Sequence, residues 1–218
     1  MLTTRRSYLA AIGGAALGVT AGCLGGSASA LPDGGDVGEL DSVSSLARPA
    51  LGPEDAPVTV DVFEDFACSH CQTFTEEVYP EIRSTYVEPG DVRYRFFDFP
   101  IPVDDTWSWA AASAARAVQA RADAETFFAF TEGVYANQGR LSEEGHQVVH
   151  DLAADLGVDG CTVAAAAEQE PYREVVEADK REGAAREVPG TPAVYVDGDA
   201  LNGYGLNTVD SAIRSRLE

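Results

Sequence analysis

The residues with the clearest capacity for chemistry are two cysteines separated by two residues, in the segment Cys68-Ser69-His70-Cys71. An alternating β-branched run over residues 58–63 precedes the pair and a helical pattern follows it, so we expect the pair at a strand-to-helix junction. The first turn of a helix has unpaired N–H groups and a partial positive charge, and both stabilise a thiolate. We therefore expect Cys68 to have a lowered pKa and to act as a nucleophile, with Cys71 able to attack the resulting mixed disulfide.

His70 lies between the two cysteines, where it can supply a hydrogen-bond donor or a positive charge to the Cys68 sulfur. Either contribution favours the thiolate and makes the disulfide more oxidising. Other interpretations of the pair stay open at this point. It could form a structural disulfide in an exported protein. A structural zinc site needs four ligands, and the folded part offers one further cysteine, Cys161. Haem attachment needs a histidine directly after the second cysteine, and Gln72 stands there instead.

The elements that must position this motif form an α/β pattern. The order strand, helix, strand over residues 58–63, 68–86 and 92–97 favours a parallel strand pair with a crossover, and Pro80 is expected to kink the helix. Residues 104–187 contain amphipathic, alanine-rich helical patterns without a convincing strand. A strand over 193–196, a hairpin at Asp197-Gly198 and a helix over 208–217 close the chain. The core is expected around Val60, Val62, Phe63, Val92, Tyr94, Phe96, Val194 and Val196.

A second candidate feature, Gly190-Thr191-Pro192, stands directly before the strand over 193–196. An X-Pro bond can be cis at modest cost, and a cis proline marks a tight, specific turn. Taken alone, this segment could equally be a loop that ends the preceding helix.

Together the two features resemble the thioredoxin fold, and specifically the DsbA-like thiol oxidoreductases, in which a helical domain is inserted within a thioredoxin core. The lead-in over residues 56–66 and the Tyr195-Val196-Asp197-Gly198 hairpin are similar to that family as well. The resemblance covers about residues 50–218. It implies an α/β thioredoxin fold with an inserted helical domain at about residues 104–187.

The resemblance also implies roles for individual residues. Cys68 would be the attacking thiol and Cys71 the resolving one, and Pro192 would be cis and would face their disulfide. Thr191, beside Gly190 in the same loop, would offer its backbone to an extended substrate chain, which gives affinity without sequence choice.

Three residues near the cysteines bear on the reaction. Glu64 and Asp65 lie just before the motif, and we expect one of them to be a proton acceptor for Cys71 and the other to be a solvated charge at the strand end. Ser69 stands where relatives commonly have proline, and this dipeptide tunes the reduction potential. No metal site and no cofactor are expected.

The N-terminus reads as an export signal followed by a lipid attachment site. Arg5 and Arg6 precede an apolar run over 8–21, which resembles a twin-arginine signal and is too short to span a bilayer. The segment ending at Cys23 resembles a lipobox, so residues 1–22 would be removed and Cys23 would carry the lipid; an ordinary cleaved signal is the alternative. Residues 23–50 are rich in Gly, Ser, Ala and Asp, which predicts a flexible tether before a domain over 51–218.

The charge balance excludes some partners. The chain has 36 acidic and 15 basic residues, for a formal net charge of −21, so nucleic-acid binding is disfavoured. Lys180 is its single lysine. This composition resembles proteins of salt-loving organisms, since concentrated salt makes self-repulsion tolerable. Together with the signal, we interpret it as haloarchaeal. An acidic protein from a GC-rich genome is the other interpretation.

We therefore expect an extracytoplasmic, lipid-anchored thiol–disulfide oxidoreductase that oxidises dithiols of exported proteins and is reset by a redox partner. The alternatives are a disulfide reductase or isomerase, or a dithiol carrier of copper, because soft thiolates select Cu(I).

Overall fold

The computed structural model describes residues 37–218 of the chain. The signal over 1–22 and the proposed lipid site Cys23 lie outside these residues. The elements are β1 (Ala50–Leu51), β2 (Val58–Glu64), α1 (Ser69–Glu77), α2 (Tyr79–Ile82), the π-helical turn η2 (Arg83–Val87), β3 (Val92–Asp98), α3 (Trp107–Gln119), α4 (Ala124–Ala136), the 3-10 turn η3 (Gln138–Arg140), α5 (Leu141–Asp155), α6 (Gly160–Gln169), α7 (Arg173–Ala185), β4 (Ala193–Val196), β5 (Asp199–Ala200) and α8 (Leu206–Leu217).

A five-stranded sheet in the order β1-β3-β2-β4-β5 carries the fold. The parallel pairing of β2 with β3 sets Val60 opposite Tyr94, while β4 runs antiparallel to β2. The helical segment between β2 and β3 is therefore the predicted crossover. It is interrupted as expected near Pro80, which lies in the first turn of α2, where a missing N–H costs little.

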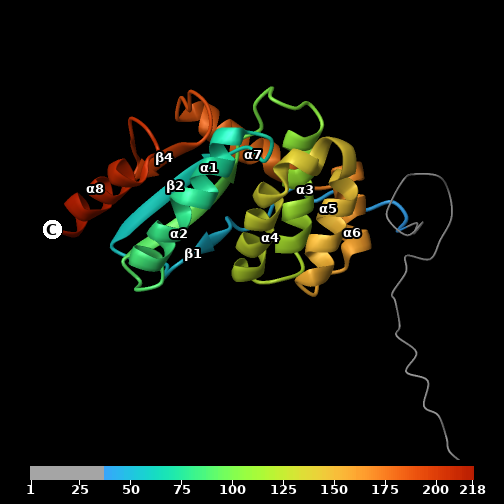
Figure 1. Ribbon diagram of the computed structural model, residues 1–218, viewed down its shortest axis with the longest axis horizontal. Coiled ribbons are helices and arrows are strands. Elements are labelled where there is room, and N and C mark those ends of the chain that lie inside the picture. The colour runs from blue at the N-terminus through green and yellow to red at the C-terminus, as the bar shows by residue number, and fades with distance from the viewer. Residues whose placement is uncertain (1–36) are drawn as a thin grey trace, which may run out of the picture.

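Side chains alternate between the two faces of the sheet, as a strand period of two requires. Val60 and Val62 point into the main core, whereas Phe63 joins Phe97, Phe99 and Tyr195 in a smaller aromatic cluster on the opposite face. In Figure 1, α1 and α2 lie across the front of the sheet. All eight residues expected in the core are buried.

The inserted helices gather at one end of the molecule and α8 with the C-terminus lies at the other (Figure 1). Helix α3 runs through the middle of the inserted group, and nearly all its residues are buried, including Ala111, Ala114 and Ala115. Small side chains allow α4 and α6 to pack closely against it, which explains why this helix is so rich in alanine.

The prediction of a flexible tether up to Ala50 is wrong for its last part. Leu40, Val43 and Leu46 are spaced by three and pack against the core, and Ala50–Leu51 forms β1 against β3. The many Gly, Ser and Asp residues of this segment hid the apolar spacing. The domain therefore begins before residue 51. Among residues 37–218, no helix is long and apolar enough to cross a membrane.

A buried ion-pair cluster connects the sheet to the inserted helices. Arg116 of α3, only 1% exposed, donates to Asp98 at 2.7 Å and to Asp179 of α7 at 2.6 Å. Asp179 also accepts from the Asp98 backbone N–H at 3.1 Å and pairs with Arg48. Because each buried charge has an opposite partner, loss of one member leaves the others uncompensated.

We expect Asp179→Ala to lower the free energy of unfolding by about 3–5 kcal/mol, because it leaves the Arg116 guanidinium short of a partner in the interior. Urea denaturation of the oxidised protein measures the change. The matched control is Glu177→Ala on the same helix, which removes exposed pairs with Arg173 and Arg181 and is expected to cost less than about 1 kcal/mol. Equal losses in the two variants would contradict the importance of the cluster.

Candidate active site

The two cysteines stand at the start of α1 as free thiols. Cys68 is the N-cap residue, with extended backbone, and its carbonyl accepts from the Cys71 backbone N–H at 3.0 Å. Cys68 is 5% exposed and Cys71 is fully buried. Cys68 is therefore the more accessible of the two cysteines.

The two thiols have opposite acidities. The hydrogen bond from the Cys71 thiol is the main cause that lowers the pKa of Cys68 to about 5; burial opposes it, and backbone N–H groups of Cys71 and His70 reinforce it. Burial raises the pKa of Cys71 well above its ordinary value, and the nearby charges of Glu64 and Cys68 raise it further. At neutral pH the reduced site thus holds a thiolate at Cys68 and a thiol at Cys71.

The loop before β4 faces the attacking sulfur. The Thr191–Pro192 peptide is cis, as predicted. The Cys68 sulfur lies 3.4 Å from the Thr191 carbonyl oxygen, to which it donates only in its protonated, thiol form. Pro192 is buried, while Gly190 has open space beside it. The structure thus brings Cys68, Thr191 and Pro192 together at one end of the sheet.

We expected one of the two acids, Glu64 or Asp65, to be a solvated charge at the strand end, and Asp65 is not. It is 1% exposed, and its carboxylate accepts from the backbone N–H groups of Ala67 at 2.7 Å and Ile101 at 2.6 Å. These bonds hold the turn into α1 against the segment after β3. Its own backbone N–H points to the Cys71 sulfur at 3.5 Å. Asp65 is therefore a positioning residue.

Glu64 is also buried, but the groups that act on its carboxyl are side-chain hydroxyls. The Thr75 hydroxyl donates to it at 3.2 Å. Burial raises the pKa of Glu64 to about 8, opposed chiefly by the Thr75 hydrogen bond. A carboxyl that titrates near neutral pH beside a buried thiol has the chemistry of a proton donor and acceptor.

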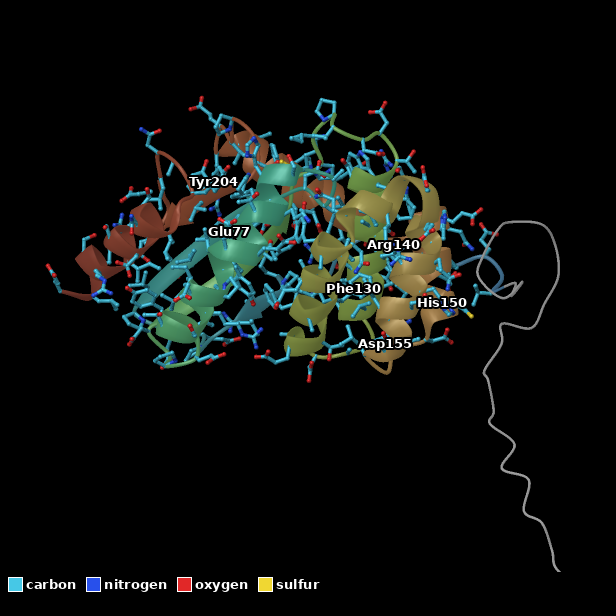
Figure 2. All side chains as sticks on the ribbon, in the orientation of Figure 1. Glu77, Phe130, Arg140, His150, Asp155 and Tyr204 are labelled. Carbon is cyan, nitrogen blue, oxygen red and sulfur yellow. The ribbon has the colours of Figure 1, made fainter. Side chains whose placement is uncertain are left out.

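The His70 ring is exposed, and its Nδ1 lies 2.8 Å from the Tyr204 hydroxyl. Tyr204 lies in the loop between β5 and α8. Figure 2 shows its label close to helix α1. The contribution of His70 that the structure places at Cys68 comes from its backbone N–H.

Comparisons with known proteins agree with this geometry. A family model described as Thioredoxin matches residues 44–214. A probable disulfide bond formation protein D from Bacillus cereus is 31% identical over 70% of this chain and 71% of its own. The disulfide bond formation protein D of Bacillus subtilis is 27% identical over 74% of this chain and 72% of its own. The crystal structure of oxidised BdbD from Bacillus subtilis covers 82% of this chain and 99% of its own, with 26% identity and a TM-score of 0.71.

This chain belongs to the DsbA-like thiol–disulfide oxidoreductases of the thioredoxin superfamily. The crystal structure of Chlamydia trachomatis DsbA, at 18% identity and a TM-score of 0.66, shares the fold. The thioredoxin fold with a helical insertion, predicted from the sequence, is confirmed.

One positioning residue of this DsbA-like protein was missed by sequence reasoning. Gln138, in the turn between α4 and α5, donates from its side-chain amide to the carbonyl oxygens of Phe66 at 2.7 Å and Cys68 at 3.1 Å. Gln138 lies about seventy residues from the motif in the sequence, and no local sequence pattern predicts this contact. The inserted domain thereby holds the backbone of the redox motif.

Among the described residues, no cluster of potential metal ligands is present. Within residues 37–218, no group of three or more His, Cys, Asp or Glu side chains lies close enough together to bind a metal ion. Cys161 is not joined to the active site, because Cys68 and Cys71 are both free thiols.

We expect the absorbance of the Cys68 thiolate at 240 nm in this reduced oxidoreductase to titrate with a midpoint near pH 5. Cys71→Ala removes the hydrogen bond that lowers this pKa most. Hydrogen bonds to charged groups are worth about 1.5–3 kcal/mol, so the midpoint should rise by about one to two pH units.

Cys68→Ala is the control and should abolish this transition. A wild-type midpoint near 9, or one that Cys71→Ala leaves unchanged, would contradict the assignment of the thiolate to this hydrogen bond.

Proposed function

We propose that this oxidoreductase oxidises the dithiols of exported proteins through a disulfide between Cys68 and Cys71. The observation that carries the proposal is the lowered pKa of Cys68, about 5, at an accessible helix N-terminus. Stabilisation of the reduced thiolate makes the corresponding disulfide a strong oxidant. The relatives named for disulfide bond formation support the same direction.

The reaction takes two steps. A substrate thiolate attacks the Cys68 sulfur, the Cys68–Cys71 bond breaks, and Cys71 leaves with the electron pair and takes a proton from Glu64. A second substrate thiolate then attacks the substrate sulfur bound to Cys68, which forms the substrate disulfide and releases Cys68 as a thiolate. The substrate loses two electrons and the enzyme gains two. One of the two substrate protons replaces the proton delivered to Cys71, and the other goes to solvent.

Glu64 is suited to the proton step because burial raises its pKa to about 8, so that it carries a proton at neutral pH. In the reverse direction, when a redox partner restores the disulfide, the Glu64 carboxylate accepts the proton of Cys71. Pro192 and the backbone of Thr191 and Gly190 receive the substrate chain in an extended form beside Cys68.

We expect a glutathione redox titration of the purified protein to give a reduction potential closer to the roughly −120 mV of DsbA than to the roughly −270 mV of thioredoxin. Alkylation and mass measurement report the state of Cys68 and Cys71. Oxidation of a reduced dithiol peptide should cease in Cys68→Ala, whereas Cys71→Ala should accumulate a mixed disulfide with the peptide. Normal turnover by Cys68→Ala would refute the proposal. A reduction potential near the thioredoxin value would show that the protein acts as a disulfide reductase instead.

We propose also that the acidic surface is an adaptation to concentrated salt of a haloarchaeal kind, supported by 36 acidic residues and a single lysine. The titration is therefore made in concentrated potassium chloride and repeated in dilute buffer. Loss of the folded protein in dilute buffer supports this proposal, and identical behaviour in both contradicts it.

We propose that the protein is exported by its twin-arginine signal and anchored to the outer face of the cell membrane through Cys23. Arg5 and Arg6 before an apolar run, and the small residues before Cys23, support this. Cys23→Ala should move the protein from the membrane fraction to the soluble one, because the lipid attachment point is lost. Arg5→Lys combined with Arg6→Lys should keep it inside the cell. Membrane retention of Cys23→Ala would refute the anchor.

A further inference from the structure

The buried position of Cys71 poses a problem for the proposed reaction. Cys71 is fully enclosed, and Cys68 is covered by the substrate while the mixed disulfide exists. The proton that Cys71 exchanges with Glu64 therefore has no path to solvent through the mouth of the site. A catalytic cycle still requires Glu64 to regain or lose that proton.

A small cavity lies on the other side of Glu64. Its volume is about 10 Å³, and it lies between the active-site helices, the sheet and the inserted domain. Its lining is Glu64, Thr75, Tyr79, Tyr94, Phe96, Phe128, Thr131 and Glu132. Helix α4 packs against α1, and its Phe128 ring stacks on Tyr79 of α2. It supplies Phe128, Thr131 and Glu132 to the cavity, which is the spacing of one helical face.

The polar groups around this cavity favour a water molecule inside it. The Tyr79 hydroxyl is buried and has no hydrogen-bond partner among the described residues. Buried hydroxyls without a partner are costly, and a polar cavity of roughly 10–15 Å³ can hold one water. The second carboxyl oxygen of Glu64 and the hydroxyls of Tyr79 and Tyr94 provide the two to four partners that such a water needs.

Glu132 forms the outer end of the cavity. Its side chain is 41% exposed and lies 3.5 Å from the Arg83 guanidinium. Burial raises its pKa above the ordinary value, and Arg83 opposes that rise. Glu132 therefore lines the cavity and is also open to solvent, as a proton relay at a protein surface must be.

We propose that protons pass between Glu64 and solvent through this cavity and Glu132, at the seam between the thioredoxin core and the inserted domain. This inference rests on the proposed role of Glu64 as the proton donor and acceptor for Cys71. During substrate oxidation the proton moves inward from Glu132 to Glu64. During reoxidation it moves outward, and the site remains covered by the bound partner in both directions.

The charged and titratable groups that face the route come from five elements, β2, α2, η2, β3 and α4. Glu64 contacts Thr75 of α1, and Tyr79 of α2 and Tyr94 of β3 line the cavity between the two acids. Arg83 lies beside Glu132, and Glu125 of α4 pairs with the same guanidinium at 2.6 Å. Glu125 does not line the cavity, and its side chain is 63% exposed. The two acids of α4 therefore share a partner but differ in access to the route.

This difference provides a matched pair of variants, Glu132→Gln and Glu125→Gln. The reduced full-length protein is mixed with excess oxidised glutathione, stopped with acid at set times, and its Cys68–glutathione adduct is followed by mass spectrometry. Formation of the adduct reports attack by Cys68, and its decay reports deprotonation and attack by Cys71. We expect Glu132→Gln to slow the decay about tenfold at neutral pH, since general acid–base groups contribute roughly a hundredfold or more. Formation of the adduct should keep its rate, and Glu125→Gln should behave as the wild type.

Chemical rescue provides a readout that a purely structural role would not move. Imidazole at increasing concentration and constant pH should restore decay in Glu132→Gln, because a small buffer can exchange protons at the exposed end of the route. Decay of Glu132→Gln at the wild-type rate, or equal slowing of formation and decay without rescue, would overturn the route.

Glu64→Gln separates this inference from the proposal beneath it. Slow decay in Glu64→Gln together with wild-type decay in Glu132→Gln would overturn the route and leave the role of Glu64 intact. Decay of the adduct at the wild-type rate in Glu64→Gln would overturn both the route and the proposed role of Glu64.

Discussion

The hydrogen bond from the Cys71 thiol to the Cys68 sulfur is the interaction on which the rest of the site depends. It requires a proton on Cys71 and a negative charge on Cys68, so the two thiols cannot be tuned independently. Burial enforces the first condition, and the start of α1 favours the second. The reduced pair of cysteines therefore has one defined protonation state. This makes directional thiol–disulfide exchange with a substrate feasible.

The surroundings of the two thiols include carboxyl groups buried in the protein interior, where a charged carboxylate is costly. Glu64 and Asp65 are adjacent and both buried, yet the fold uses them differently. Two backbone N–H groups hold the Asp65 carboxylate, and this fixes the turn before Cys68. Glu64 accepts from side-chain hydroxyls such as that of Thr75, and burial raises its pKa to about 8, so it keeps a labile proton. Glu64 is the last residue of β2, whereas Asp65 begins the turn into α1, which explains how neighbours of the same chemistry reach such different surroundings.

The sequence was sufficient for features written in local patterns. The strand-to-helix setting of Cys68 and the parallel pair around it follow from runs of a few residues. The cis bond before Pro192 and the helical insertion followed from the resemblance of these local motifs to the DsbA-like family. Features that depend on distant contacts were out of reach. The burial of Asp65 depends on Ile101, and the ordering of residues 40–50 depends on an apolar spacing hidden among small polar residues. Gln138 and Arg116 find their partners only when the chain is folded.

The contact made by Gln138 has a mechanical consequence. Its amide spans the carbonyl oxygens of Phe66 and Cys68 from a turn of the inserted domain. Any rocking of that domain against the sheet would pull on the backbone that aims the attacking sulfur. While these two hydrogen bonds hold, the inserted helices and the sheet move together, and loss of either bond would shift the backbone that positions the Cys68 sulfur.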